Sequence, residues 1–305
     1  MSPRLLSHLA MLLFAALIAG SFTTGALAVP FLAPVPLNAV RFVTAALIMG
    51  VMAFGVMRQP FAWPKAPWRF GIMGFLMAIY FVTMFIALTI TKPVATSAVY
   101  TLVPIMTAAT AFVLVGQRSG PTVLLSLALA GMGAVWVIFH GDIEAILGFD
   151  IGQGELIYFI GCFAYAFYTP LLRRYSRGEP ALTQSFWTLL ATAIWITAYG
   201  LPEIVAVDWL SLPPVVWWVV LYLAVGPTAI CFFLIQFASK HLPAAKVIAY
   251  GYLTPAFVIL FEGFAGHGWT TLSVVIGALV TVLGLVVLAF VPDGQPGPRG
   301  STSSP

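Results

Sequence analysis

Long uninterrupted apolar segments determine what this chain can fold into. No charged residue occurs between Phe70 and Thr91, and none occurs between Leu272 and Phe290. About 20 apolar residues are enough to cross the roughly 30 Å hydrocarbon core of a bilayer as a helix. Over the whole chain 61% of residues are hydrophobic and 7% are charged, whereas soluble domains carry about 25% charged residues. The sequence therefore predicts a polytopic, all-α integral membrane protein.

Ten transmembrane helices can be placed along the 305 residues, with breaks where polar residues and prolines gather. The predicted spans are roughly 7–27, 36–57, 67–89, 93–116, 120–139, 153–172, 182–202, 213–238, 243–265 and 271–291. The segment 292–305 is rich in Gly, Pro and Ser and is expected to be a disordered cytoplasmic tail. Residues 1–140 and 141–291 would then each hold five spans, and no soluble domain is predicted.

The N-terminal segment also has features of a cleavable signal peptide. Arg4 precedes an apolar run from Met11, and this run ends at Ala26-Leu27-Ala28. Removal of the segment would leave nine spans and would break the repeat described below. We therefore favour a retained first span.

The basic residues predict the orientation of the spans, because cytoplasmic loops carry most of the Lys and Arg of a membrane protein. With the N-terminus in the cytoplasm, 11 of the 13 basic residues fall in inside loops, whereas Lys92 falls outside and Arg41 lies within a span. Both termini are therefore predicted to be cytoplasmic, with the protein in the inner (plasma) membrane.

The same residues argue against several partners. The net charge of +4 comes from basic residues scattered between apolar blocks, whereas nucleic-acid binders gather them on one face. Cys162 and Cys231 both lie inside apolar stretches, which indicates packing rather than a disulfide or a metal pair. We expect no nucleic acid, metal or cofactor. The expected partners are a small-molecule substrate and membrane lipid, and a monomer is compatible with this.

The two halves share an internal repeat at an offset near 150 residues. The matches, in chain order, are Pro36 and Phe42 with Pro180 and Phe186, Trp68 and Pro93 with Trp218 and Pro243, Leu102-Val103-Pro104 with Leu253-Thr254-Pro255, and Gly116-Gln117 with Gly266-His267. Five spans is an odd number, so the second copy would enter the membrane from the opposite side. Such inverted repeats are typical of secondary transporters, whose substrate site lies between the halves near the midplane.

These motifs, with Ala19-Gly20-Ser21-Phe22 and Arg41-Phe42, resemble those of EamA-type transporters, members of the drug/metabolite transporter superfamily. The resemblance covers residues 5–291. It implies two inverted five-helix halves around a central cavity, with spans five and ten packed peripherally. Members export amino acids and other small metabolites, and the resemblance includes YddG-like aromatic amino-acid exporters. The family commonly has Trp where Ala19 stands and Glu where Gln117 and His267 stand, so no mechanism that needs those carboxylates is carried over.

Two charged residues within the spans are candidate gating residues. Arg41 lies about one and a half turns from the outer end of its span, and a charge inside a span costs at least about 2.5–3.5 kcal/mol. It should face the interior with a partner, for which Glu262 near the outer end of the ninth span is the candidate. The pair would form an outer gate, or Arg41 would clamp a substrate carboxylate. The alternative is that both side chains extend to the outer interface.

Mid-span tyrosines are candidate substrate-binding residues, because a hydroxyl there needs a hydrogen-bond partner or water. Belt tyrosines usually lie at the membrane interfaces instead. The predicted substrate-binding residues are Tyr80, Tyr100, Tyr165, Tyr168 and Tyr252, with Tyr250 close by. They would line a cavity suited to an apolar or aromatic solute with a few polar groups. Core packing is the alternative role.

Three prolines, Pro104, Pro227 and Pro255, are expected to interrupt helices near mid-membrane. Pro104 and Pro255 occupy repeat-related positions, so we assign them a gating role. Lys92 and Lys246 lie near span ends and are interpreted mainly as interfacial anchors.

Secondary transport is the function that these features favour. The chain has no H-E-x-x-H or G-x-S-x-G motif for an intramembrane enzyme, and no charged ring typical of a channel; an accessory membrane subunit is a further alternative. No nucleotide-binding motif is present, so transport would use gradients. Glu262, the carboxylate predicted within the ninth span, lies near its outer end, which favours uncoupled exchange or facilitated export over proton coupling.

Overall fold

The computed structural model describes residues 2–91, 96, 99–117, 120–139, 141–148, 152–264 and 271–290. All regular elements in these ranges are helices. The helices are α1 (Pro3–Ala28), α2 (Pro34–Gly50) with its π-helical extension η1 (Val51–Val56), α3 (Trp68–Ile90), α5 (Val103–Val115), α6 (Pro121–Ile138), α7 (Ile143–Leu147), α8 (Gln153–Tyr175), α9 (Ala181–Ala206), α10 (Pro214–Leu223), the π-helical η2 (Ala224–Ile230), α11 (Cys231–Ser239), α12 (Ala244–Ala249), the 3₁₀ turn η3 (Tyr250–Leu253), α13 (Thr254–Phe264) and α14 (Leu272–Phe290).

Eight helical segments among these residues are long and apolar enough to cross a membrane. They are Pro3–Gly25, Pro34–Val56, Trp68–Ile90, Gln153–Tyr175, Ala181–Ala206, Pro214–Ser239, Ala244–Phe261 and Leu272–Phe290. Each coincides with a predicted span. The predicted fourth and fifth spans are represented by the shorter apolar helices α5 and α6, and their inclusion in a total of ten stays a prediction.

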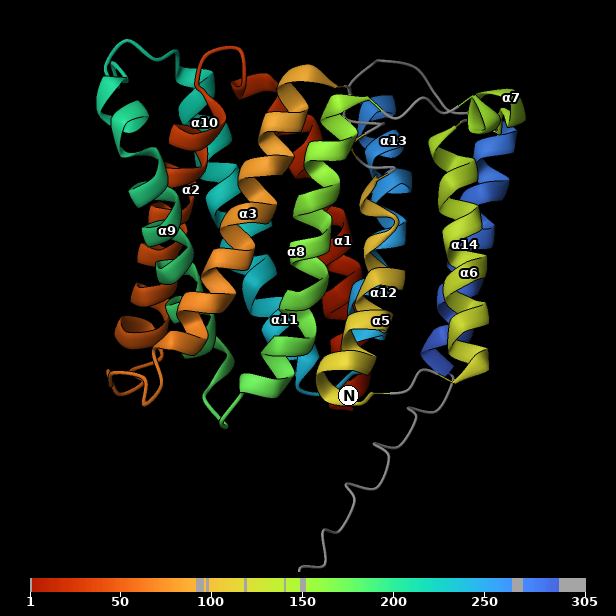
Figure 1. Cartoon of the computed structure of the whole chain (residues 1–305), viewed down its shortest axis with the longest axis horizontal. Coiled ribbons are helices and arrows are strands. Elements are labelled where there is room, and N and C mark those ends of the chain that lie inside the picture. The colour runs from red at the N-terminus through yellow and green to blue at the C-terminus, as the bar shows by residue number, and fades with distance from the viewer. Residues whose placement is uncertain are drawn as a thin grey trace, which may run out of the picture.

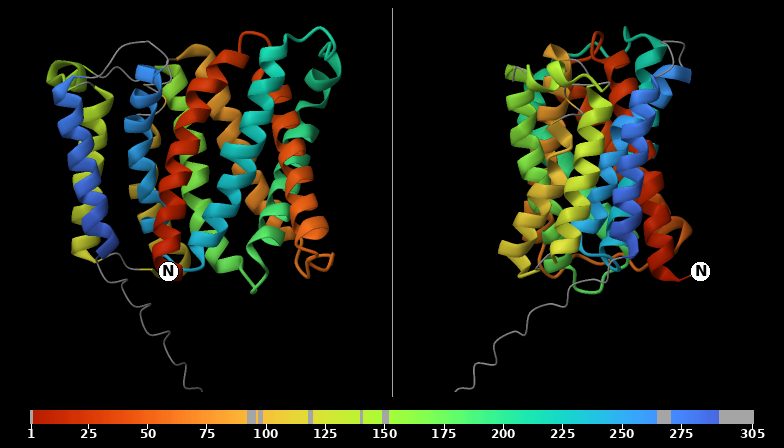
Figure 2. Two further views of the ribbon diagram at one scale, coloured as in Figure 1. Left: turned by 180° about the vertical axis from the view of Figure 1, so that it is seen from behind. Right: turned by 90° about the vertical axis from the view of Figure 1, so that its right-hand side faces the viewer.

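The helices stand side by side as an elongated bundle (Figure 1). α3 packs on α8 and α9, α2 packs on α9, and α5 packs on α8 and α12. α1 lies in the middle of the bundle, between α11 and α13, as the view from behind also shows (Figure 2). Its residues Met11, Ala15, Ala19 and Phe22 are completely buried. α1 is thus part of the buried core of the bundle.

The pair of α6 and α14 forms one end of the bundle (Figure 1). These two helices pack mainly on each other, and their other contacts run through α12, η3 and α13. They correspond to the predicted fifth and tenth spans, which the family resemblance placed at the periphery.

Two of the three central prolines each start an α-helix directly after a break in the helical chain. Pro104 is the second residue of α5, and Pro255 is the second residue of α13, directly after the 3₁₀ turn η3. The first N–H groups of a helix have no intrahelical partner, so a proline there removes no hydrogen bond. The expected interruptions lie directly before these prolines, at turn residues 101–102 before α5 and at the 3₁₀ turn η3 before α13. Pro227 does lie inside a helical span, within the π-helical η2.

Glycines set the closest helix approaches. A Cβ at Gly74 of α3 would lie 2.7 Å from backbone atoms of Ala191 and Thr192 in α9. One turn earlier, a Cβ at Gly71 would meet nothing within 4 Å. Helices in membranes associate through such small residues because they let the backbones approach. Gly74 thus sets the distance between α3 and α9.

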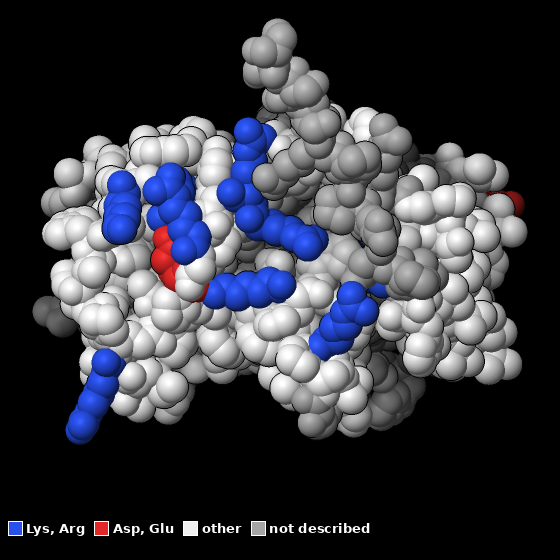
Figure 3. Space-filling view, turned by 90° about the horizontal axis from the view of Figure 1, so that it is seen from below, with Lys and Arg blue, Asp and Glu red and all other residues white. Residues whose placement is uncertain are grey.

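One end of the bundle is basic. Arg69 at the start of α3, Arg173 and Arg174 at the end of α8, Arg177 and Lys240 all lie there, and Figure 3 views this end directly. We call it the basic face. At this face Arg174 links α8 to α5, because its guanidinium donates a 2.6 Å hydrogen bond to the carbonyl of Leu114 at the end of α5.

Candidate functional site

Four of the predicted substrate-binding tyrosines come together in the centre of the bundle. Tyr165 of α8 stacks on Tyr80 of α3 with ring centroids 4.5 Å apart, and on Tyr168 one turn further along α8 at 6.0 Å. The Tyr100 ring lies 6.3 Å from Tyr165 and 6.4 Å from Tyr80. The Tyr100 hydroxyl is buried and has no hydrogen-bond partner among the described residues. We call these four rings the tyrosine cluster.

Tyr158 joins this cluster, although the sequence prediction omitted it. Its hydroxyl donates to the Tyr80 hydroxyl over 3.0 Å, and its side chain is completely buried. Tyr158 precedes Tyr165 by two helical turns and so occupies the same face of α8. That spacing is the signal that identifies it.

Tyr252 lies outside the cluster. It is buried, but in the described part of the chain no ring contact joins it to the four tyrosines. It faces α6 instead, where a Cβ on Gly131 would lie 3.3 Å from its hydroxyl. Its neighbour Tyr250 accepts or donates a 2.7 Å hydrogen bond with Nδ1 of His8 near the start of α1. Tyr252 was predicted to line one cavity with the other tyrosines, but in this structure it packs against α6 instead.

The space at the centre is small in this conformation. A cavity of about 10 Å³ lies between α1, α3, α8 and the η2–α11 segment, lined by Tyr80, Tyr165, Tyr168, Phe81 and Phe232 among others. That volume holds about one water molecule. The aromatic rings themselves fill the centre, so a larger solute needs them to separate.

Arg41 is the one fully buried charge beside this cavity among the described residues. Its side chain has no exposed surface, and its guanidinium lies 4.5 Å from the centre of the Phe81 ring. Its Nε donates a 2.6 Å hydrogen bond to the hydroxyl of Thr228. Both terminal nitrogens have no hydrogen-bond partner among the described residues. A buried cation with two unused donors is costly, and it is suited to bind an anion.

Thr228, which accepts from Arg41, directly follows Pro227 in the π-helical η2. A proline has no N–H, so the carbonyl of Leu223, four residues earlier, loses its usual helical partner. The Thr228 hydroxyl donates to that carbonyl over 2.6 Å. Its single proton is thereby used, and the oxygen can only accept, which is what Arg41 Nε requires. The π-helical turn at Pro227 thus orients the arginine.

The predicted Arg41–Glu262 pair stays a prediction, because the Glu262 side chain lies outside the described residues. The helix backbones do not favour it. α2, which carries Arg41, packs on α9 and η2, whereas α13 packs on α1 and α6. Lys92 also lies outside the described residues. Lys246 lies in α12 with 4% of its surface exposed.

A second cavity of about 220 Å³ opens at the basic face. It is lined by Leu172, Arg173, Ser176, Gln184, Gln236, Ser239 and Lys240, from the ends of α8 and α11 and the start of α9. We call it the vestibule. The amide of Gln236 donates to the Tyr168 hydroxyl over 3.4 Å. Since Tyr168 also lines the central cavity, this contact lies between the vestibule and the central cavity.

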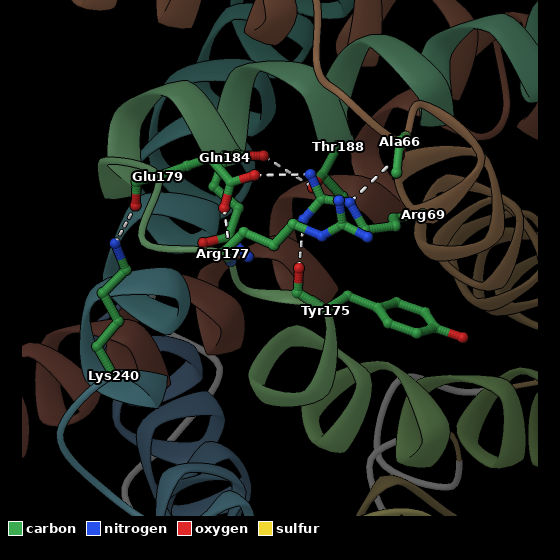
Figure 4. A network of polar contacts seen from close by, with 8 residues as sticks. All are labelled: Ala66, Arg69, Tyr175, Arg177, Glu179, Gln184, Thr188 and Lys240. Atoms are coloured by element: carbon green, nitrogen blue, oxygen red, sulfur yellow. Dashed lines mark hydrogen bonds and ion pairs between the residues drawn. The ribbon is translucent and has the colours of Figure 1, made fainter.

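Beside the vestibule, Arg69 fastens the α8–α9 loop to α3 (Figure 4). Its guanidinium forms a 2.6 Å ion pair with Glu179 and donates to the backbone carbonyl of Tyr175. The other carboxylate oxygen of Glu179 accepts from the N–H of Arg177 at 2.8 Å, and the Glu179 carbonyl accepts from Lys240. Burial alone would raise the pKa of Glu179, but the hydrogen bonds from Arg69 and the Arg177 N–H outweigh it and lower the pKa.

Glu179→Gln should loosen this loop. The substitution leaves Arg69, which is 2% exposed, without its counter-ion, at a cost of about 1–3 kcal/mol. Because the folded-state pKa of Glu179 is depressed, the wild-type tether is complete above its unfolded pKa near 4.5 and is lost only as pH falls through the folded value. At neutral pH we expect several-fold faster tryptic cleavage after Arg177 in the variant.

The matched control for this prediction is Glu203→Gln, which removes an exposed carboxylate near the end of α9. It should leave the cleavage rate unchanged. Equal rates for Glu179→Gln and wild type would show that the ion pair does not restrain the loop.

Comparisons with known proteins add three findings. A sequence model described as the EamA-like transporter family matches residues 5–139 and again residues 152–290. The Bacillus subtilis (strain 168) protein YyaM, an uncharacterized transporter, is 27% identical over 223 residues, which cover 72% of this chain and 70% of YyaM. A protein of known crystal structure superposes with a TM-score of 0.75 over 95% of this chain and 99% of its own, at 23% identity. The last likeness concerns the fold alone.

Proposed function

Because this chain belongs to the EamA-like transporter family, we propose that it is a secondary transporter that exports amino acids or related small metabolites by alternating access. The observation that carries the substrate class is Arg41, whose two terminal nitrogens have no partner among the described residues. They lie beside an aromatic centre that includes Phe81, Tyr80 and Tyr165. A solute with a carboxylate and an apolar or aromatic side chain matches both features, as in YddG-like exporters.

Two inverted five-helix halves, residues 1–140 and 141–291, form the proposed framework, with ten spans in total. The family model matches the chain twice, once in each half. The helix contacts support an exchange symmetry between the halves. α3 packs on α8 as the α10–α11 segment packs on α1, and α5 packs on α8 as α13 packs on α1. In such a framework the halves can exchange conformations and open to alternate sides.

The protein is a multi-span membrane protein, and we place the basic face in the cytoplasm, as in the inner membrane of a bacterium. The concentration of Arg and Lys at that end supports this orientation (Figure 3). α1 begins and α14 ends at the same end of the bundle (Figure 1), which agrees with two cytoplasmic termini.

The conformation is best interpreted as inward-facing with a collapsed substrate site. The vestibule at the basic face holds about 220 Å³, whereas the central cavity holds about 10 Å³. Substrate would separate the rings of Tyr165 and Tyr168 and reach Arg41. The breaks before Pro104 and Pro255 would act as hinges, with Glu262 as the partner of Arg41 in another state. This is compatible with uncoupled exchange or facilitated export.

Flux measurements test the proposal. Proteoliposomes containing the protein should show saturable counterflow of labelled phenylalanine, and the variant Tyr165→Ala should reduce it at least about 10-fold, because stacking and orientation in the centre are lost. The matched control Tyr199→Ala removes a tyrosine of α9 that is 71% exposed on the outer surface, and it should transport normally. Flux that rises linearly with concentration would indicate a channel, and no flux of any amino acid would refute the substrate class.

A further inference from the structure

We propose that the vestibule is a loading site that binds the carboxylate of the solute before it reaches the tyrosine cluster. This inference rests on the proposed transport function and adds to it a second, separate binding site for the same substrate. It assigns the carboxylate to Arg173 and Lys240, and the remaining polar groups of the solute to neutral side chains on the opposite wall.

The charge of the vestibule is positive and is not neutralised within its lining. Arg173 and Lys240 line the cavity together with neutral residues only. In the described part of the chain neither forms an ion pair, since Lys240 donates to the backbone carbonyl of Glu179. The Glu179 carboxylate is occupied by Arg69 and by the Arg177 N–H. Burial lowers the pKa of Lys240, and Glu179 offsets part of this. An anion bound between them would form charge-assisted hydrogen bonds with both cations.

The neutral wall supplies buried hydrogen-bonding groups. Gln184 and Gln236 are 2% and 1% exposed, and Ser239 is 5% exposed. The Ser239 hydroxyl is buried and has no partner among the described residues. An unpaired buried hydroxyl is costly unless something fills its hydrogen-bonding capacity. Amide and hydroxyl oxygens can accept from an ammonium, and their N–H and O–H groups can donate to a carboxylate.

The size of the vestibule limits the ligand. Its volume of about 220 Å³ lies below the roughly 300–1,000 Å³ typical of sites for drug-sized ligands. A solute of amino-acid dimensions fits a cavity of this volume, whereas a peptide or a lipid headgroup with its chains does not.

The vestibule lies next to the tyrosine cluster, so a solute bound there is placed to enter the centre of the bundle. Gln236 lies on its wall and hydrogen-bonds Tyr168 at 3.4 Å, and Tyr168 stacks on Tyr165 in the tyrosine cluster. A ligand that takes over the amide of Gln236 releases the Tyr168 hydroxyl. Occupation of the vestibule thus weakens the contact that closes the path to the centre.

A cysteine reporter tests the site without requiring transport. The native thiols Cys162 and Cys231 are buried, with 0% and 1% exposure, and should not react. Ser176, a half-buried residue of the vestibule wall, is changed to cysteine in the full chain in neutral phosphatidylcholine vesicles. Its labelling is compared for anionic and cationic methanethiosulfonates, each rate being divided by the rate with a free thiol.

We expect the anionic reagent to react about 10-fold faster or more, as charge-lined clefts do with opposite ions. Lys240→Gln or Arg173→Gln, each in the Ser176→Cys background, should reduce this ratio at least about threefold. Arg177→Gln is the matched control, since Arg177 is an exposed cation of the same face outside the cavity lining. Equal rates for the two reagents, or an equal effect of Arg177→Gln, would overturn the proposal. Arg173 is exposed, so its variant remains informative if Lys240→Gln fails to fold.

Protection experiments then identify binding. Labelling of Ser176→Cys by neutral methyl methanethiosulfonate should slow in the presence of phenylalanine and not of phenylalaninamide, which lacks the carboxylate. Protection should disappear in Arg173→Gln. Equal protection by the amide, or protection only when anionic lipid is added, would refute a site for a free carboxylate. Protection without any flux would refute the transport proposal and leave the site standing, whereas flux without protection would refute the site alone.

Discussion

Arg41→Met should make the protein more stable and abolish its transport. Methionine retains the length of the side chain and removes a charge that has no exposed surface and two unpartnered nitrogens. Replacing buried charge by apolar residues of similar volume is neutral or stabilising by about 1–4 kcal/mol. Thr228 tolerates the change, because its hydroxyl keeps its bond to the Leu223 carbonyl.

The same loss of charge should abolish transport. If Arg41 binds the substrate carboxylate, its removal costs about 2–5 kcal/mol of binding free energy, which is roughly a 30-fold or larger loss of affinity. Thermal melting and counterflow of the same preparation measure both effects. Arg41→Lys keeps the charge without the two-pronged guanidinium, so it should give no stabilisation and weak transport.

Thr228→Val separates the role of the arginine from that of its support. It leaves Arg41 Nε and the Leu223 carbonyl without their hydrogen bonds, so it should lower both stability and transport. A stable Arg41→Met variant that still transports at the wild-type rate would rule out Arg41 as the carboxylate site.

Gly74→Ala should strongly destabilise the contact between α3 and α9. Its Cβ would lie 2.7 Å from the backbone of α9, and backbone cannot rotate away as a side chain can. The two helices must separate, which costs about 1–3 kcal/mol or more. Because α3 also carries Tyr80, the separation should disturb the tyrosine cluster and reduce transport as well.

Gly71→Ala is the matched control, on the same helix and one turn away. Its Cβ would meet no atom within 4 Å, and alanine favours a helix over glycine by up to about 1 kcal/mol. It should therefore be neutral or stabilising. Equal melting temperatures for the two variants would show that the α3–α9 distance is not set by Gly74.

The positions of most helices follow from composition alone, whereas the contacts of the site do not. An uncharged stretch such as 70–91 has few alternatives to a membrane helix, so α3 was predicted almost to its ends. The partner of Arg41 could not be predicted in this way. Thr228 lies 187 residues away, and its hydroxyl donates to the Leu223 carbonyl while its oxygen accepts from Arg41.

The tyrosines likewise include contacts that the sequence predicts and one that it does not. Tyr80, Tyr165 and Tyr168 share faces of two helices that pack together, so a mid-span position was enough to group them. Tyr252 lies within the 3₁₀ turn η3, whose backbone geometry differs from that of an α-helix, and its side chain faces α6. Proline positions predicted where the backbone breaks, but the direction of each side chain after a break depends on turn geometry.

Hydrocarbon from the bilayer is expected to complete one part of this bundle. An apolar groove of about 600 Å³ runs between α5 and α6, lined by Ile105, Phe112, Leu124 and neighbouring small residues, and few protein contacts tie the α6–α14 pair to the remaining helices. In a membrane, acyl chains lie against these side chains and supply the packing that protein atoms do not. The chain length and saturation of the surrounding lipids should therefore tune how firmly this pair is held, so that the host membrane is itself one of the determinants of the fold.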